Sequence, residues 1–206
     1  MTNGLPFLYP PPSEPPVPGQ TTVEIPLSWP DLRLLLFPKQ AGLETITMTL
    51  GVLGSSMEED GKWWKFGGAS FQFRAPGDTL LTHRDLSYGQ KRLLSFLYYL
   101  DCNPHFAIAD ELVNGMHHDW ISFCLDELRT RQAFLTSQNP LLLDQLAFES
   151  VEEVKGTFIQ CRADQDEGGT RFRWAALSDE DAAELYADYG AGIQHVGELL
   201  RLRGLW

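Results

Sequence analysis

The chain has 206 residues, of which 43% are hydrophobic and 21% charged, so it can bury a core and is not disordered as a whole. Its 28 acidic residues outnumber 16 Lys and Arg, and the net charge of −12 excludes a general basic field that would coat nucleic acid or an anionic membrane. No apolar run approaches the ~18 residues of a membrane span, and Cys102, Cys124 and Cys161 lack metal-ligand spacing, which favours a cytoplasmic protein with reduced thiols and no membrane partner.

The first eighty residues predict an arm followed by β-structure. Residues 1–20 contain seven prolines and predict an extended arm. Residues 21–80 predict an antiparallel β-rich segment with three candidate strand regions. Residues alternate over Thr21–Leu27, Glu44–Leu53 is rich in Thr, Ile, Val and Leu, and Trp63–Arg74 should form one or two short strands. Between them we expect a short apolar turn or helix over Asp31–Phe37 that Pro38 closes, and a polar loop over Gly54–Gly61.

Residues 81–206 predict alternating helices and strands. Helical spacing of leucines follows Ser87 and should stop before Asn103-Pro104. The further elements expected are a buried strand at His105–Ala109, a helix from Asp119, a strand at Gln132–Thr136, a helix at Pro140–Leu146, a hairpin formed by Val151–Cys161 and Thr170–Ala176, and a final helical region that Ser178 caps and Gly190 and Gly192 interrupt. This order predicts an α/β layer with its strands buried between helices.

The start of the first long helix suits an anion. Unpaired N–H groups and the positive end of the dipole attract phosphate there, Ser87 adds a hydroxyl, and Gly89 lets the backbone approach closely. Ser87 and Gln90, three residues apart, also match a capping box, and in that interpretation they only cap the helix.

Two further segments offer polar groups at strand ends. Asp110, directly after an apolar strand, can hold Mg²⁺, and Glu111 can orient or deprotonate an attacking water. Gln138, after the next strand, can contact a γ-phosphate or that water through its amide. The simpler alternatives are a solvated loop for the two acids and a turn before Pro140 for Gln138.

Together these segments resemble the ATP-binding-cassette (ABC) ATPases. Leu86-Ser87-Tyr88-Gly89-Gln90 looks like the signature motif, Phe106–Glu111 like the Walker B strand with its catalytic glutamate, and Asn114-Gly115-Met116-His117 like the loop that follows it. Thr136–Pro140 looks like the switch segment. The resemblance covers about residues 65–165 and is strongest to the soluble branch of chromosome-maintenance, recombination-repair and overcoming-lysogenization-type ATPases, which includes phage-defence proteins.

The resemblance implies a P-loop NTPase fold, ATP and Mg²⁺ as cofactors, and a sandwich of two heads. It assigns catalysis to Glu111 and Gln138, metal binding to Asp110, and nucleotide contacts to Ser87, Gly89 and Gln90. The chain departs from the family in having Leu112 after the two acids, Gln138 in place of the switch histidine, and no Gly-x-x-x-x-Gly-Lys-Ser/Thr sequence, which is Walker A.

The missing Walker A makes residues 81–206 resemble the C-terminal lobe alone. Such a chain would be a homodimer or would complete the site of a partner ATPase that contains Walker A; alternatively it is an inactive interaction module. Either residues 21–80 cover part of the apolar face that the missing lobe would cover, or that face is exposed and the chain should dimerise, bind a partner or aggregate. The family's processes include DNA repair and phage defence, so nucleic acid is a further candidate partner.

Two clusters are interpreted without a functional role. His117-His118-Asp119 could suggest a metal, but consecutive residues do not converge unless the loop folds back. Arg171 and Arg173 alternate with Phe172 and Trp174 in a strand, and two arginines in so acidic a chain are thin evidence for a nucleic-acid surface.

Overall fold

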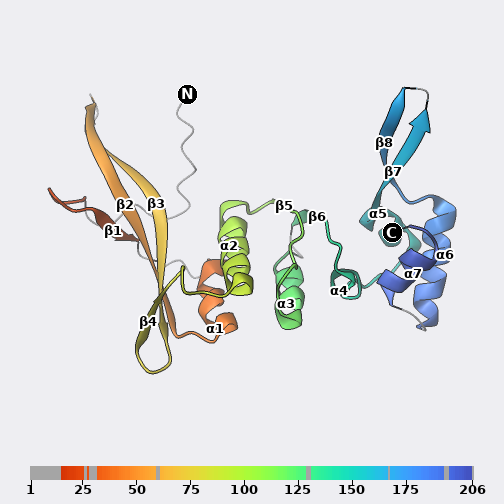
Figure 1. Ribbon diagram of the computed structural model, residues 1–206, viewed down its shortest axis with the longest axis horizontal. Coiled ribbons are helices and arrows are strands. Elements are labelled where there is room, and N and C mark those ends of the chain that lie inside the picture. The colour runs from red at the N-terminus through yellow and green to blue at the C-terminus, as the bar shows by residue number, and fades with distance from the viewer. Residues whose placement is uncertain are drawn as a thin grey trace. The chain divides into compact units, whose positions relative to one another are not determined.

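The computed structural model describes residues 15–25, 27, 32–58, 61–128, 131–166, 168–192 and 195–205 (Figure 1). Most of the expected proline-rich arm, residues 1–14, lies outside this part of the chain. The chain forms two compact units, residues 1–135 and 136–206. It is a mixed α/β protein with two antiparallel sheets and one parallel strand pair.

The first unit opens with a four-stranded antiparallel sheet in the order β1-β2-β3-β4. Its strands are β1 (Thr22–Ile25), β2 (Thr45–Glu58), β3 (Gly61–Ala75) and β4 (Thr79–Thr82). The antiparallel β-structure predicted here is confirmed, but the polar loop predicted over Gly54–Gly61 is wrong, because β2 continues to Glu58. Ser55 and Ser56 lie in the strand opposite Trp64 and Trp63, whose large side chains favour a paired strand.

Two short helical elements precede β2. They are the 3-10 helix η1 (Arg33–Leu36) and the helix α1 (Phe37–Ala41). The prediction that Pro38 closes a helix is wrong. Pro38 lies in the first turn of α1, where a backbone N–H has no intrahelical partner to lose.

Helix α2 (Tyr88–Cys102) begins after Ser87 and ends before Asn103, as predicted. Near its end Asp101 is buried and accepts hydrogen bonds from the backbone N–H groups of Arg33 (2.8 Å) and Leu34 (3.0 Å). Burial raises the pKa of this carboxyl above its ordinary value, although the two N–H groups oppose that shift. Asp101 thus ties α2 to η1.

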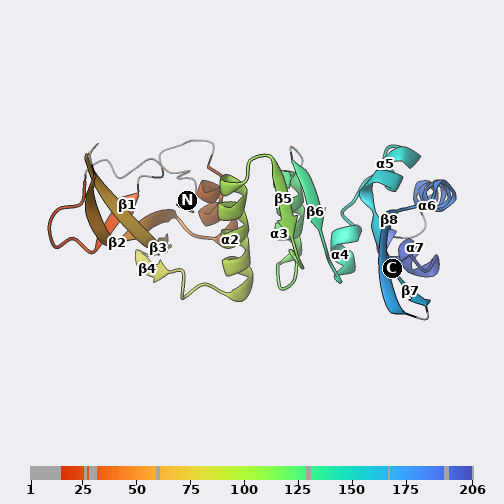
Figure 2. The same cartoon turned by 90° about the horizontal axis from the view of Figure 1, so that it is seen from above.

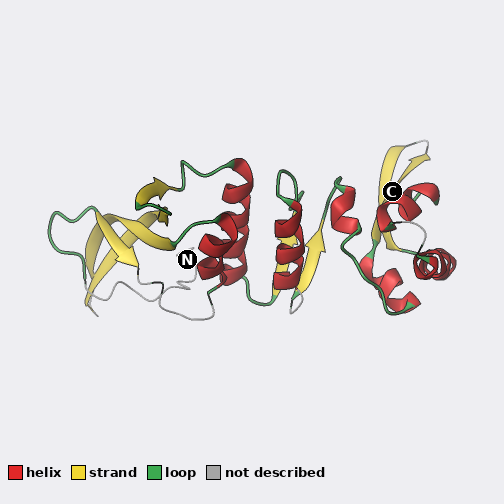
Figure 3. Ribbon diagram, turned by 90° about the horizontal axis from the view of Figure 1, so that it is seen from below, coloured by secondary structure: helices red, strands yellow, loops and turns green. Residues whose placement is uncertain are grey.

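A parallel strand pair completes the first unit. Strands β5 (Phe106–Ala109) and β6 (Gln132–Leu135) pair in parallel, and α3 (His118–Leu128) lies beside them (Figures 2 and 3). The indole N–H of Trp120 on α3 donates to the carbonyl oxygen of Gln40 (3.1 Å), so α3 also contacts α1. The expected helix–strand–helix–strand order is confirmed here.

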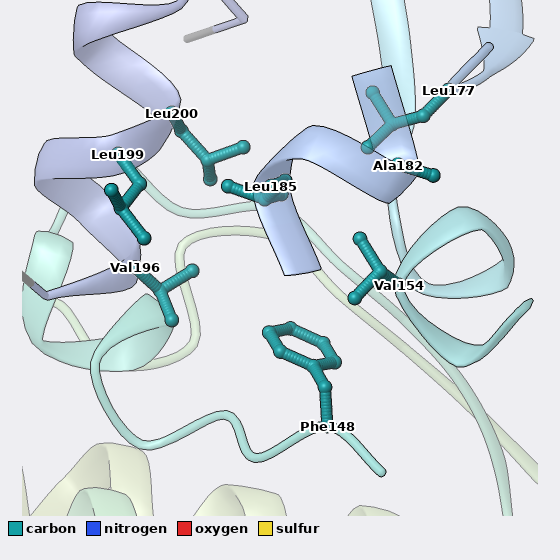
Figure 4. Packing of buried hydrophobic residues seen from close by; sticks show 8 residues of the cluster. All are labelled: Phe148, Val154, Leu177, Ala182, Leu185, Val196, Leu199 and Leu200. Atoms are coloured by element: carbon teal, nitrogen blue, oxygen red, sulfur yellow. The ribbon is translucent and has the colours of Figure 1, made fainter. Parts of the chain in front are cut away.

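The second unit consists of four helices and an antiparallel hairpin. They are α4 (Pro140–Leu143), α5 (Val151–Thr157), β7 (Ile159–Asp166), β8 (Gly169–Ala176), α6 (Asp179–Ala191) and α7 (Val196–Leu202). Its core is formed by residues of α5, α6 and α7 and of the loop before α5. Phe148, Val154, Leu185 and Val196 face one another there (Figure 4).

Two predictions for this unit need correction. Residues 151–157 are helical rather than part of a strand, because Ser150 caps the helix and Glu152 and Glu153 occupy its first turn. Helix α6 runs through Gly190 and ends at Gly192, whose φ of 67° makes it the left-handed cap. None of the helices that the structure describes is long and apolar enough to cross a membrane.

Candidate functional site

Ser87 and Gln90 form the predicted capping box. The Ser87 hydroxyl oxygen accepts from the Gln90 backbone N–H (3.3 Å), and the Gln90 Oε1 accepts from the Ser87 backbone N–H (2.9 Å). The Gln90 Nε2 also donates to the carbonyl oxygen of Ala41 (3.4 Å). Gln90 therefore already uses both ends of its amide within the chain, whereas Ser87 is exposed. A ligand at this helix start would meet the Ser87 side chain first.

Gly89 lies where α2 approaches the loop that follows β5. A Cβ atom on Gly89 would be 2.6 Å from the carbonyl oxygen of Gly115 and 3.2 Å from the Trp120 ring. The Tyr88 ring in turn lies against Gly115, whose φ is 74°. The signature-like segment and the loop after the Walker-B-like strand thus pack together, and this close approach alone requires a glycine at position 89.

The two acids follow β5 in different environments. Asp110 is exposed, whereas Glu111 is half-buried. Glu111 has a φ of 50°, a left-handed conformation that an ordinary side chain rarely adopts. Strained backbone of this kind gathers at functional positions, where the surrounding structure must hold it in place.

Arg92 on α2 holds this strained turn. Its guanidinium donates to the carbonyl oxygen of Glu111 and, at 3.4 Å, to that of Asp110. It also donates to the Tyr88 hydroxyl (2.9 Å), and the Asn114 backbone N–H donates to the same Glu111 carbonyl (3.1 Å). Sequence reasoning missed Arg92, and its only signal was its place one helical turn beyond Tyr88.

Gln138 belongs to the second unit. It is exposed and precedes Asn139, whose side chain caps α4 by accepting from the Leu141 backbone N–H (3.0 Å). The Asn139 backbone N–H donates to the Ser137 hydroxyl (3.0 Å). The turn before Pro140 is thus present, and Ser137 and Asn139 form it. Ser87, Gly89, Gln90, Asp110 and Glu111 all lie in the first unit.

The strand pair that leads to the acids has one uncovered face. Phe106 and Ile108 of β5 are 48% and 62% exposed, and Phe134 of β6, opposite Ile108, is 45% exposed. Ala107, between them, is fully buried on the other face. The expectation of strands buried on both sides is therefore wrong for β5 and β6, whereas the expected exposed apolar face is present. Parallel sheets are ordinarily covered on both faces.

The loop after the acids brings three possible ligand atoms together. The His117 and His118 Nδ1 atoms lie 3.3 Å and 3.0 Å from the two Asp119 carboxylate oxygens. One ligand atom from each residue lies within 4.8 Å of the others, so the expectation that these consecutive residues do not converge is wrong. All three side chains are exposed, and their mutual contacts account for the arrangement without an ion.

A hollow of about 530 Å³ lies elsewhere in the first unit, between β3 and α2. Its walls include the apolar Phe71, Leu94 and Tyr98 and the basic His83 and Lys91. The Lys91 ammonium donates to the Arg84 carbonyl oxygen (2.9 Å). None of the six candidate residues lines this hollow, so it is not the phosphate site that the motifs predict.

Comparison with known proteins leaves the family open. No family model and no curated protein matches the chain. A solved structure concerning ATP-driven dimerization and DNA-stimulated activation of SMC ATPases is 11% identical, with a TM-score of 0.41, and the match covers 77% of this chain and 91% of that one. An Smc head domain with a coiled coil and joint derived from Pyrococcus yayanosii is 14% identical, with a TM-score of 0.39 over 77% of this chain and 28% of that one. Likeness at this level does not decide function.

Proposed function

We propose that this chain is part of an ABC-type ATPase and supplies the signature, Walker B and switch segments of a composite ATP site. Walker A would come from another polypeptide or from an N-terminal lobe. The observation that carries the proposal is the parallel pair β5–β6, which ends in Asp110-Glu111 and leaves Phe106, Ile108 and Phe134 exposed. A pair of four-residue parallel strands is stable only within a larger, covered sheet.

The residues of the strand end fit the proposed chemistry. Asp110 offers an exposed carboxylate, and oxygen ligands are those that Mg²⁺ prefers. The metal would neutralise charge that develops on the phosphate oxygens. Glu111 would take a proton from the water that attacks the γ-phosphorus, while the bond to the β–γ bridging oxygen breaks and ADP and phosphate leave. Arg92 would keep Glu111 in its strained turn.

The helix start and the switch segment would act on the γ-phosphate. Ser87 and the N–H groups near Gly89 would contact a nucleotide held by the opposite head, because their signature-like segment acts in trans in the family they resemble. Gln90 would hold Ser87 in place through the capping box. Gln138 would replace the usual switch histidine, and its amide can donate to a phosphate oxygen or accept from the water.

The isolated chain should bind ATP poorly. Walker A supplies the lysine and the backbone N–H groups that cradle the β- and γ-phosphates, and this sequence has none. We expect calorimetry with ATP and Mg²⁺ to give no saturable binding in the micromolar range. Micromolar affinity of the isolated chain would contradict the composite site.

The decisive test replaces Glu111 in the assembled complex. The tagged chain would be purified from its own host together with the chains that accompany it, and ATP turnover would be measured. We expect Glu111→Gln to lower turnover at least ~100-fold while ATP stays bound, because a general base contributes about that much or more. Glu152→Gln, an exposed acid on α5, is the matched control and should leave turnover unchanged.

The same experiment decides between the proposal and an inactive interaction module. A complex that forms but hydrolyses no ATP, or one in which Glu111→Gln has no effect, would reject the enzymatic role. The exposed face of β5 and β6 would then serve only to bind a partner.

A further inference from the structure

The hairpin β7–β8 carries an apolar face that the chain does not cover. Side chains alternate along each strand, and the register puts Ile159, Cys161 and Ala163 on the same side as their partners Ala176, Trp174 and Phe172. All six are exposed, with Ile159 at 54%, Phe172 at 69% and Trp174 at 67%. The hairpin projects from the helices of its own unit (Figure 1).

The opposite face of the hairpin is polar, and its side chains pair with one another except at its base, where the Gln160 Nε2 donates to the carbonyl oxygen of Leu205 (3.4 Å). The Arg162 guanidinium donates to the Gln160 side chain (2.8 Å), and the Arg173 guanidinium lies 3.0 Å from the Asp164 carboxylate. Strict alternation of this kind is typical of a sheet with one face in water and one face packed. The polar face is therefore the solvent side, and the apolar face is the side that needs an occupant.

We propose that the occupant is a second copy of this chain, bound face to face through its own β7–β8 hairpin. The apolar face has a ridge, formed by Phe172 and Trp174 of β8, beside a shallow row, formed by Cys161 and Ala163 of β7. A two-fold axis parallel to the strands sets the ridge of each copy over the row of the other. The same patch then serves both subunits, as a two-fold interface requires.

Charge also favours this pairing. Residues 159–176 contain three arginines and three acidic residues and so carry no net charge, whereas the whole chain carries −12. Contact between two copies at this hairpin therefore adds no repulsion between net like charges. The apolar face contains no basic or acidic side chain that contact between two copies would bury.

The area of the face predicts a weak dimer. Large aromatic side chains bury roughly 150–250 Å² each, so a face of this composition covers on the order of 500 Å² per copy, or about 1,000 Å² in total. That is near the lower limit for a specific interface. We expect half-association at roughly 10–100 µM.

Sedimentation equilibrium of the full chain tests the proposal. The mass should rise with concentration from 23.3 kDa toward twice that value. A double variant, Phe172→Ser with Trp174→Ser, should remain monomeric. The matched control, Leu53→Ser with Trp63→Ser, removes two exposed apolar side chains from the β2–β3 hairpin and should dimerise like the wild type. A wild type that stays monomeric, or a Phe172/Trp174 variant that dimerises normally, would overturn the proposal.

Cross-linking gives an independent measurement that does not depend on the double variant folding. Stacked sheets lie about 10 Å apart and neighbouring strands in one sheet about 4.8 Å apart, so the two Cys161 Cα atoms would lie roughly 11 Å from each other. This distance is too long for a disulfide but within reach of a short bismaleimide. Burial raises the pKa of Cys124 to about 12 and also raises that of Cys102, so Cys161 is the exposed thiol that reacts first. We expect a cross-linked dimer that Cys161→Ser abolishes, and absence of that product would count against the interface. Neither result depends on the proposed ATP site.

Discussion

The left-handed backbone at Glu111 can be tested by comparing two small side chains. Glu111→Ala and Glu111→Gly remove the same carboxylate and differ only in the Cβ atom. At a φ of 50° a Cβ atom costs about 1–2 kcal/mol. Glycine loses about 0.4–1 kcal/mol more chain entropy on folding. We therefore expect the Gly variant to be more stable than the Ala variant by about 0.5–1 kcal/mol.

Urea denaturation of the full chain measures this difference. Asp126, an exposed residue within α3, provides the control, because at a helical position Ala should be more stable than Gly by about 0.5–1 kcal/mol. The order of the two variants should thus reverse between positions 111 and 126. If Ala is the more stable residue at both positions, Glu111 is not strained, and the argument that Arg92 maintains a functional turn fails.

Two further changes test how the first unit is held together. Asp101→Ala leaves the part-buried Arg33 N–H and the buried Leu34 N–H without an acceptor and should lower the free energy of unfolding by about 2–4 kcal/mol, and Asp101→Asn by about half as much. Burial raises the pKa of Asp101, so the folded state holds this proton more tightly than the unfolded state does. Denaturation curves should therefore show that the wild type gains stability relative to Asp101→Asn as the pH falls from about 7 to about 4. Gly89→Ala places a methyl group against the Gly115 carbonyl and should lower the free energy of unfolding by about 1–3 kcal/mol, and with it the melting temperature. Gly190→Ala, where nothing lies within 4 Å of the added methyl group, should raise the melting temperature. Equal melting temperatures for these two glycine variants would contradict the packing at position 89.

Local chemistry determined most of the elements that the sequence predicted. The capping box at Ser87 and the leucines of α2 gave that helix within a residue at each end. Errors arose where a distant partner decided the outcome. The serines at the end of β2 favoured a loop prediction, yet pairing with β3 keeps them extended. Pro38 was predicted to end a helical segment, although a proline is also compatible with the first turn of a helix.

The sequence proposes residue types for the candidate site, Ser87 and the two acids among them, but not the contacts that support them. Nothing in the sequence indicated the left-handed turn at Glu111, because φ follows from the surrounding contacts and not from the residue type. Arg92 was equally hidden, since a surface arginine on a helix has many other uses. Its contact with the Glu111 carbonyl depends on how α2 packs on the loop after β5.

Electrostatics favour the proposed composite site, in which a second polypeptide would supply the phosphate cradle. A triphosphate brings several negative charges to a chain that already carries −12 and would have to approach Asp110 and Glu111. Arg92 lies on this turn, and its guanidinium donates to the carbonyl oxygens of Asp110 and Glu111 and to the Tyr88 hydroxyl. A lysine and a nest of N–H groups from a second polypeptide would reverse the sign of the local field. ATP affinity would then arise only upon assembly, and nucleotide binding and partner binding would stabilise each other.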